Sequence, residues 1–136
     1  MFKQTITLFN YIPSKDTYLT TLLSQCEFQN SFRTIPEEYE TSEATSAIAL
    51  VMAYEDYQGI YVLGNNKKYF KYPKQWNEDT DYFTIQNNTD FIMLGDYTDM
   101  VDINLNDIKN GFDNVFVINR FKYFIDDLKH FELYVN

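Results

Sequence analysis

Apolar and polar residues alternate at the start of the chain, which is the pattern of a β-strand with one buried face. Between residues 5 and 12, Ile6, Leu8 and Ile12 share one face, and Pro13 ends the segment. Residues 18–28 alternate in the same way and are rich in threonine and tyrosine, which favour strands. The four residues between the segments, Pro-Ser-Lys-Asp, are typical of a turn. We expect two antiparallel strands joined by this turn.

Residues 44–54 are compatible with two kinds of structure. Their alanines allow a helix, whereas Ile48, Leu50 and Met52 would share one face of a strand, and we favour the strand. Shorter apolar stretches bounded by turn residues are also expected to be strands: 60–63, 69–72, 82–85, 91–94, 115–121 and 128–135. Many short strands with turns between them predict a mainly β fold, either a small β-barrel or a β-sandwich.

One short helix is expected near residues 105–110, in the segment Leu-Asn-Asp-Ile-Lys-Asn. Asparagine side chains cap helix starts well, so either Asn104 or Asn106 would be the N-cap. Gly111 stands where a glycine stop after the last turn would stand.

The alternation fails between residues 29 and 43, where the chain is polar and acidic and contains Pro36. We expect a long polar loop there, a place where contact surfaces often lie, with a solvated acidic face formed by Glu37, Glu38, Glu40 and Glu43. No repeat, low-complexity tract or linker divides the chain. Residues 1–136 are therefore expected to form a single β domain.

Composition and charge narrow the possible functions. Hydrophobic residues make up 45% of the chain and aromatic residues 18%, which supplies enough apolar surface for a core. Twenty acidic and 11 basic residues give a net charge of -9, which opposes binding to a phosphate backbone. The net charge can be interpreted in three ways: it keeps the protein soluble, it lets DNA pass without binding, or it mimics DNA.

The chain shows no segment that would carry it to or through a membrane. Its first residues lack the uninterrupted apolar run of a signal peptide, and no stretch approaches the roughly 18 apolar residues of a membrane helix. Cys26 is the only cysteine, so no intramolecular disulfide can form. We expect a protein made in a cytosol-like, reducing solution, with no membrane contact.

Few side chains are suited to catalysis. Cys26 and the only histidine, His130, lie in predicted strands without a nucleophile motif, and we expect a buried small residue and a half-exposed structural histidine. The four glycines are too scattered to form a phosphate-binding loop. The carboxylates between Asp96 and Asp107 lack the spacing of a calcium loop. We therefore expect no enzymatic activity, no cofactor, no metal and no small-molecule substrate.

Aromatic and basic side chains crowd together between residues 67 and 76. This segment contains Lys67, Lys68, Tyr69, Phe70, Lys71, Tyr72, Lys74 and Trp76. Exposed aromatic rings anchor protein contacts at a small entropic cost, and the lysines would suit an acidic partner such as a second copy of the chain. The alternative is that the rings belong to the core and the lysines are their solvated neighbours.

The second half of the chain resembles head-closure ("stopper") proteins and related minor virion proteins of long-tailed bacteriophages. The resemblance lies in Phe83-Thr-Ile, the turn Asn87-Asn-Thr-Asp90, the strand Phe91-Ile-Met-Leu-Gly95 and two later strands, Val115-Phe-Val-Ile and His130-Phe-Glu-Leu. It implies a β-barrel that joins a ring of identical subunits between the DNA-filled head and the tail. The polar loop, with Glu37, Glu38 and Tyr39, would then reach a neighbouring subunit or constrict the channel.

This resemblance implies a structural subunit of the virion, made in the host bacterium, with copies of itself and other virion proteins as partners. DNA would make only passing, non-specific contact with its acidic surface. Two alternatives remain open. An acidic inhibitor could mimic DNA and bind a host nucleic-acid enzyme, although its carboxylates would then be expected along one face rather than in clusters. A small enzyme is the third possibility.

Overall fold

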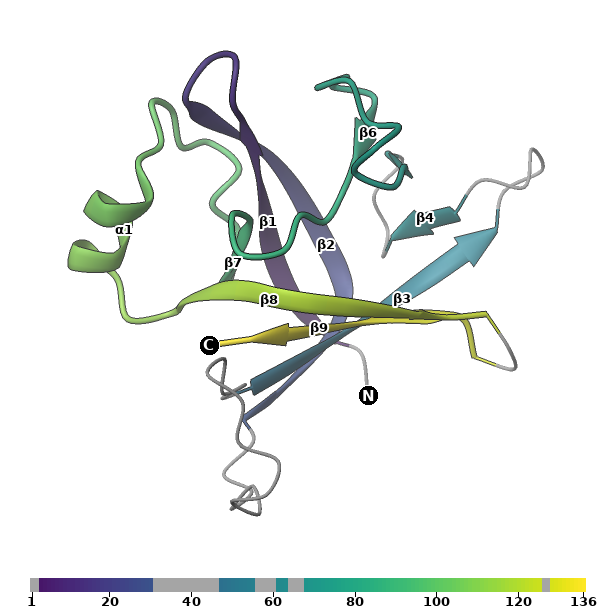
Figure 1. Cartoon of the computed structure of the whole chain (residues 1–136). Helices are drawn as coiled ribbons and strands as arrows, with labels where there is room; N and C mark the ends of the chain where they lie inside the picture. Colours follow the sequence, from purple (N-terminus) through teal and green to yellow (C-terminus); the bar gives the residue numbers. More distant parts are fainter. Residues whose placement is uncertain (1–2, 31–46, 56–60, 64–67, 126–127) are drawn as a thin grey trace, which may run out of the picture.

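A closed barrel of six antiparallel strands forms the body of the molecule. The computed structural model describes residues 3–30, 47–55, 61–63, 68–125 and 128–136. Its barrel strands are β1 (Gln4–Ile12), β2 (Thr17–Asn30), β3 (Ala47–Glu55), β7 (Phe91–Leu94), β8 (Val115–Phe124) and β9 (His130–Val135). They lie in the order β2-β1-β7-β8-β9-β3, and pairing of β3 with β2 closes the barrel (Figure 1).

The long strand β2 makes the closure possible because its two halves pair with different neighbours. Its first half continues the β1 hairpin, while residues from Cys26 onward pair with β3. Cys26 lies at the corner, with Gln4 opposite it in β1 and Val51 opposite it in β3. A register irregularity in β1 between Gln4 and Ile6 lies at the same corner, as expected where a strand bends. The predicted hairpin of the first two strands is confirmed.

Small side chains from β3 face the barrel interior. Ala47, Ala49 and Val51 are fully buried, whereas the larger residues between them are only partly buried. The strand expected over residues 44–54 is thus confirmed over Ala47–Glu55, and the face shared by Ile48, Leu50 and Met52 is the outer one. Larger residues from the other strands complete the interior: Ile6, Leu8, Leu23, Ile92, Ile118, Phe131 and Leu133.

Three short strands extend β3 away from the barrel. They are β4 (Tyr61–Leu63), β5 (Tyr69–Phe70) and β6 (Tyr82–Phe83), and they pair in that order, the last two in parallel. Phe70 and Phe83 from this extension belong to the same buried cluster as the barrel interior. The extension therefore shares the barrel's core.

The helix α1 (Leu105–Gly111) and the loop before it cover the outer face of β1 and β7. Phe9 and Phe91 stack there with ring centroids 4.3 Å apart, and Ile103 and Ile108 pack against them. Asn104 is the N-cap, and its side chain accepts hydrogen bonds from the backbone of Asn106 and Asp107. The short helix is confirmed, but Gly111 is its last residue rather than the stop after it, because Phe112 forms the C-cap.

Residues 29 and 30, the first of the polar loop expected over residues 29–43, belong to a strand instead. Gln29 still pairs with Ile48, so β2 continues to Asn30. Residues 31–46 lie outside the part of the chain that the structure describes. A mainly β domain with a small barrel and, among the described residues, one short helix is the architecture that the sequence predicted.

Candidate functional site

The aromatic and basic segment predicted as an interface is divided between core and surface. Phe70 and Trp76 are buried, with exposed fractions of 8% and 7%. The Phe70 ring packs against Phe131 at a centroid distance of 4.9 Å, and the Trp76 indole donates to the backbone oxygens of Asp79 and Tyr82. These two rings therefore belong to the core, as the alternative interpretation of this segment predicted.

The remaining members of that segment are more accessible. Tyr72 is half exposed and Tyr69 is partly buried. Lys68 donates to the backbone oxygen of Thr20 and to the Thr21 hydroxyl, and burial lowers the pKa of this lysine. The Lys71 ammonium lies 3.8 Å from the centre of the Tyr82 ring. Lys67, Glu37, Glu38 and Tyr39, which completed the predicted interface, lie outside the described residues.

Cys26 and His130 flank strand β3 but point to opposite faces of the sheet. Cys26 is paired with the buried Val51, whereas His130 is paired with Met52 on the outer face. Because paired residues point to the same side and neighbours along a strand point to opposite sides, the thiol and the imidazole are separated by the sheet. They cannot act together as nucleophile and base.

Both side chains have structural partners. The Cys26 thiol donates to the Leu23 carbonyl at 3.4 Å, and burial raises the pKa of the thiol to about 12. The His130 ring stacks on Phe124 at a centroid distance of 4.7 Å, and its Nε2 lies 3.3 Å from a carboxylate oxygen of Glu132. A buried cysteine and a partly exposed structural histidine are the roles that the sequence indicated.

A buried carboxylate, which the sequence did not single out, ties β1 to the turn before β7. Asp90 is fully buried and accepts five hydrogen bonds: from the Asn10 amide, the Tyr11 backbone, both the backbone and the side chain of Gln86 and, at 3.5 Å, the Thr89 hydroxyl. Burial raises the pKa of Asp90 to about 6, against the lowering effect of these donors. Because all of these groups donate hydrogen bonds to its carboxylate, Asp90 serves as a structural hydrogen-bond acceptor.

The acidic residues near α1 do not gather into a metal site. The carboxylate of Asp96 accepts bonds from the backbone and hydroxyl of Thr98, and Asp107 lies in the first turn of α1. Over the described ranges, no three histidine, cysteine, aspartate or glutamate side chains come close enough to hold a metal ion. In the same ranges, no helix is long and apolar enough to cross a membrane.

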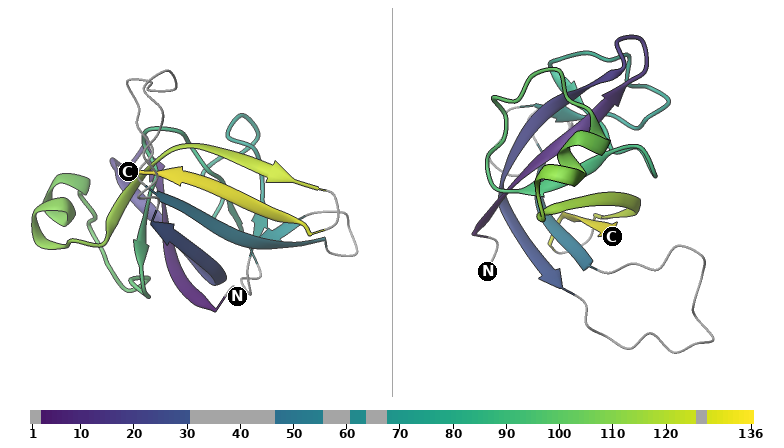
Figure 2. Two further views of the ribbon diagram at one scale, coloured as in Figure 1. Left: turned by 90° about the horizontal axis from the view of Figure 1, so that it is seen from below. Right: turned by 90° about the vertical axis from the view of Figure 1, so that its left-hand side faces the viewer.

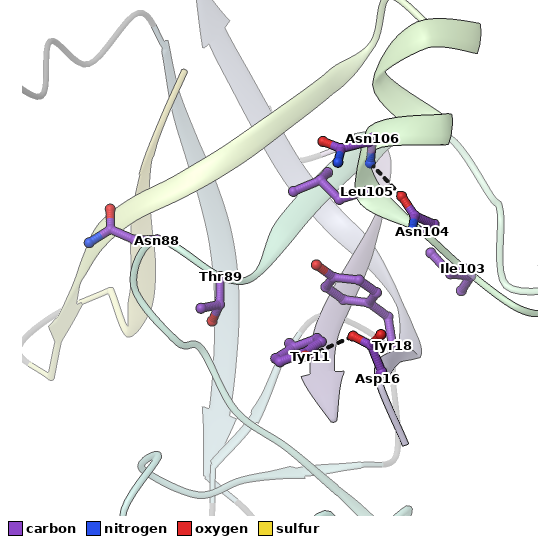
Figure 3. A pocket seen from close by; sticks show the side chains of 9 residues that line it. All are labelled: Tyr11, Asp16, Tyr18, Asn88, Thr89, Ile103, Asn104, Leu105 and Asn106. Atoms are coloured by element: carbon purple, nitrogen blue, oxygen red, sulfur yellow. Dashed lines mark hydrogen bonds between the residues drawn. The ribbon is translucent and has the colours of Figure 1, made fainter. Parts of the chain in front are cut away.

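An open hollow lies between the β1–β2 turn and the start of α1, and its volume is about 340 Å³. Nine residues line it: Tyr11, Asp16, Tyr18, Asn88, Thr89, Ile103, Asn104, Leu105 and Asn106. Figure 3 shows the two tyrosine rings in the middle, with Asn88 and Thr89 to one side and Ile103 and Asn104 to the other. The sequence did not indicate this hollow because its residues come from three separate segments.

The geometry of the two tyrosines is fixed by their neighbours. Their ring centroids are 5.3 Å apart with an angle of 53° between the planes. The Tyr11 hydroxyl donates to Asp16 at 2.8 Å, and the Tyr18 and Phe91 rings pack in a T-shaped arrangement. Asp16 and Asn88 both have positive φ values, 49° and 68°, a conformation that aspartate and asparagine tolerate better than other residues. The β1–β2 turn thus places Asp16 at the rim of the hollow, and the turn before β7 places Asn88 there.

A second, smaller hollow of about 240 Å³ lies beside α1 and has mainly apolar walls. Its lining includes Val101, of which 81% is exposed, and Phe112, of which 38% is exposed. At the other end of β8, the turn to β9 carries a further exposed group, Phe124, Ile125 and Leu128. Figures 1 and 2 show α1 and this turn at opposite ends of β8.

Comparison with known proteins identifies a family but no activity. No curated protein and no solved structure matches the chain. The chain does match the family described as "Family of unknown function (DUF6751)", over residues 1–135. Because this match covers nearly all of its 136 residues, the chain belongs to the DUF6751 family.

Proposed function

We propose that this protein is a non-enzymatic structural subunit of a bacteriophage virion, a component of the head-closure or head–tail connector ring in the neck. Its partners are copies of itself and other virion proteins, and it is made in the cytoplasm of the host bacterium. DNA makes only passing contact with its acidic surface, since a net charge of -9 repels the phosphate backbone.

The closed barrel and its filled interior support a structural role. Large side chains such as Phe131, Leu133 and Ile118 occupy the interior and are fully buried. Closure also leaves no open edge among the six barrel strands, and open edges are the places through which β proteins aggregate. Such a barrel suits a rigid building block whose contacts are made by its outer surface and loops.

The observation that carries the proposal is the position of the exposed apolar side chains. Val101 and Phe112 line the hollow beside α1, which precedes β8, whereas Phe124 ends β8 and Ile125 and Leu128 follow it. A contact between unlike ends of identical subunits is head-to-tail, and such contacts close into rings when the rotation between neighbours permits. Large exposed apolar groups are common at protein interfaces.

Single cysteines at the two ends test this arrangement. We expect Val101→Cys and Ile125→Cys variants, when mixed and oxidised, to give disulfide-linked pairs that contain one copy of each. The double variant should give a ladder of covalent oligomers that stops at the ring number, as read by denaturing electrophoresis and native mass spectrometry. Cys26 does not interfere because it is buried.

The exposed Lys74, between β5 and β6, provides a matched control, since it belongs to neither exposed apolar group. Lys74→Cys mixed with Ile125→Cys should give no product above background. A protein that stays monomeric at high concentration, remains monomeric with neighbouring virion proteins and is absent from purified particles would contradict the proposal. A one-to-one complex with a host nucleic-acid enzyme would instead favour the DNA-mimic alternative.

A further inference from the structure

The hollow lined by Tyr11 and Tyr18 contains none of the exposed apolar residues of the head-to-tail contact proposed above, although Ile103 and Asn104 also line the smaller hollow beside α1. It opens between the β1–β2 turn and α1, and its residues are separate from the exposed apolar groups at the two ends of β8. Its volume of about 340 Å³ lies at the lower end of the range for small-molecule sites, about 300–1,000 Å³. A ligand of one or two rings would fill it.

Several polar groups around this hollow are not used by the protein itself. Within the described part of the chain, the Tyr18 hydroxyl and the side-chain amides of Asn88 and Asn106 make no hydrogen bond. Asp16 uses one carboxylate oxygen for the Tyr11 hydroxyl, which leaves its second oxygen available. These groups lie on different sides of the two rings (Figure 3).

The charge of the lining excludes anionic ligands. Asp16 is the one charged residue among the nine that line the hollow, and no lysine, arginine or histidine is among them. The protein as a whole is also strongly acidic. A phosphate or carboxylate ligand would therefore meet repulsion without a compensating cation.

Whether a cationic or a neutral ligand fits the hollow depends on the side-chain amides of Asn88 and Asn106. An asparagine side chain offers two N–H donors and one carbonyl oxygen with two lone pairs, so Asn88 and Asn106 present donors and acceptors in equal number. A cation has no acceptor for those donors. A ligand with several hydroxyl groups can donate and accept at each of them, and so can satisfy amide, hydroxyl and carboxylate partners together.

We propose that this hollow is a binding site for a neutral saccharide, with the apolar face of one sugar ring against Tyr11 and Tyr18 and its hydroxyl groups on Asp16, Asn88 and Asn106. Aromatic faces supply apolar contact area with little entropy lost, which suits the C–H face of a sugar ring. The hollow is open, so either a free sugar or one residue of a glycan chain has access. This proposal does not depend on ring assembly.

Titration of the ¹⁵N-labelled full-length chain, followed by heteronuclear NMR, tests the site. The probes are glucose, galactose, mannose, rhamnose and N-acetylglucosamine, with arginine and inorganic phosphate as charged comparisons. We expect one or more of the sugars to shift the backbone amides of Asp16, Tyr18, Asn88 and Asn106, with a Kd of about 1–10 mM. An oligosaccharide of the preferred sugar that binds at least about tenfold more tightly identifies a glycan, and equal affinity identifies the free sugar.

Two variants and a matched control separate binding from folding. Asn106→Ala removes an exposed amide from the hollow and should weaken binding about tenfold or more, while Asn110→Ala makes the same change on the same helix away from the hollow and should leave binding unchanged. Tyr18→Phe keeps the ring against Phe91 and removes only the hydroxyl, so binding should weaken without loss of the folded spectrum.

Two results would overturn the proposal. In one, none of the sugars shifts these amides at about 50 mM, a concentration that would saturate a site of the expected affinity. In the other, arginine shifts the same amides more strongly than every sugar, which would identify the hollow as a cation site.

Discussion

The side-chain amide of Asn10 donates to the carboxylate of Asp90 at 2.7 Å, and both residues are fully buried. The same amide donates to the backbone oxygen of Thr84, while the amide oxygen of Asn10 accepts from the Thr84 backbone. This pair therefore joins β1, the chain after β6 and the turn before β7 at one point. Buried polar groups with all partners present hold such segments in one arrangement.

Asp90→Asn should destabilise the fold strongly. The substitution replaces one acceptor oxygen with an NH₂ group among five donors, so at least one buried donor loses its partner. We expect a buried donor without its partner to lower the free energy of unfolding by about 2–4 kcal/mol, as measured by urea denaturation. The exposed Asp113 provides the control: Asp113→Asn should change stability by less than about 0.5 kcal/mol.

The same carboxyl group should make stability depend on pH. Burial raises the pKa of Asp90 to about 6, whereas an unfolded aspartate titrates near its ordinary value of about 3.9. As the pH falls from 7 to 4, the folded state binds a proton before the unfolded state does, so this group stabilises the fold increasingly, by up to about 3 kcal/mol. The stabilisation is complete below the unfolded pKa and is lost as the pH rises through 6.

Comparison with Asp90→Asn isolates this contribution from the other carboxylates. We expect the difference in unfolding free energy, native protein minus variant, to grow between pH 7 and pH 4. A difference that stays constant or shrinks over that interval would mean that the hydrogen-bond donors outweigh burial and keep the pKa of Asp90 low.

Cys26 should be unreactive in the folded protein. Its thiol is fully buried at the barrel corner, and burial raises the pKa to about 12, so almost no thiolate exists at pH 8. A chromogenic disulfide reagent should label the native chain only as fast as it unfolds, and should label it at once in concentrated urea. Fast labelling without urea would show an accessible thiol. Cys26→Ala should cost about 1–2 kcal/mol through loss of packing.

Much of the barrel was predictable because each strand carries its own local signal. In β1, Ile6 and Leu8 point inward as the alternation indicated. The opposite face of β1 was harder to predict, since Phe9 is also fully buried, against Phe91 of β7 and under α1. Burial on both faces depends on how distant segments pack, and local periodicity carries no information about that.

The candidate sites could likewise be predicted only in part, because they depend on how distant segments pack. The sequence placed Phe70 and Trp76 in an aromatic segment, but an aromatic residue at an interface and one in a core have the same local pattern. The hollow was not predicted at all. Its two turns, around Asp16 and around Asn88, were each expected, yet only the order of strands in the barrel brings them together.

The helix cap offers a direct comparison between two asparagines that the sequence could not separate. Asn104→Ala removes the acceptor for the backbone of Asn106 and Asp107 and should destabilise the protein by about 0.5–2 kcal/mol. Asn106→Ala should be neutral or slightly stabilising, because Asn106 is exposed inside the helix and alanine is the better helix former. Thermal denaturation of the two variants measures the difference, and equal losses would contradict the assignment of Asn104 as the cap.

Gly95 and Gly111 should respond in opposite directions to replacement by alanine. Gly95 has a φ of 118°, which side chains rarely adopt, and an added Cβ would lie 3.1 Å from the Tyr97 ring. Its backbone also accepts from the Thr7 hydroxyl and donates to the Thr5 carbonyl, so the backbone cannot relax without breaking these bonds. Gly95→Ala should therefore cost about 1–3 kcal/mol of unfolding free energy.

Gly111 provides the matched control because it ends α1 with no atom within 4 Å of an added Cβ. Gly111→Ala should stabilise the protein by up to about 1 kcal/mol, since alanine restricts the unfolded chain and favours the helical conformation. Urea denaturation of both variants gives the two values. If Gly111→Ala were as destabilising as Gly95→Ala, Gly111 would have to be the left-handed stop after the helix that its sequence position indicated, and α1 would end one residue earlier.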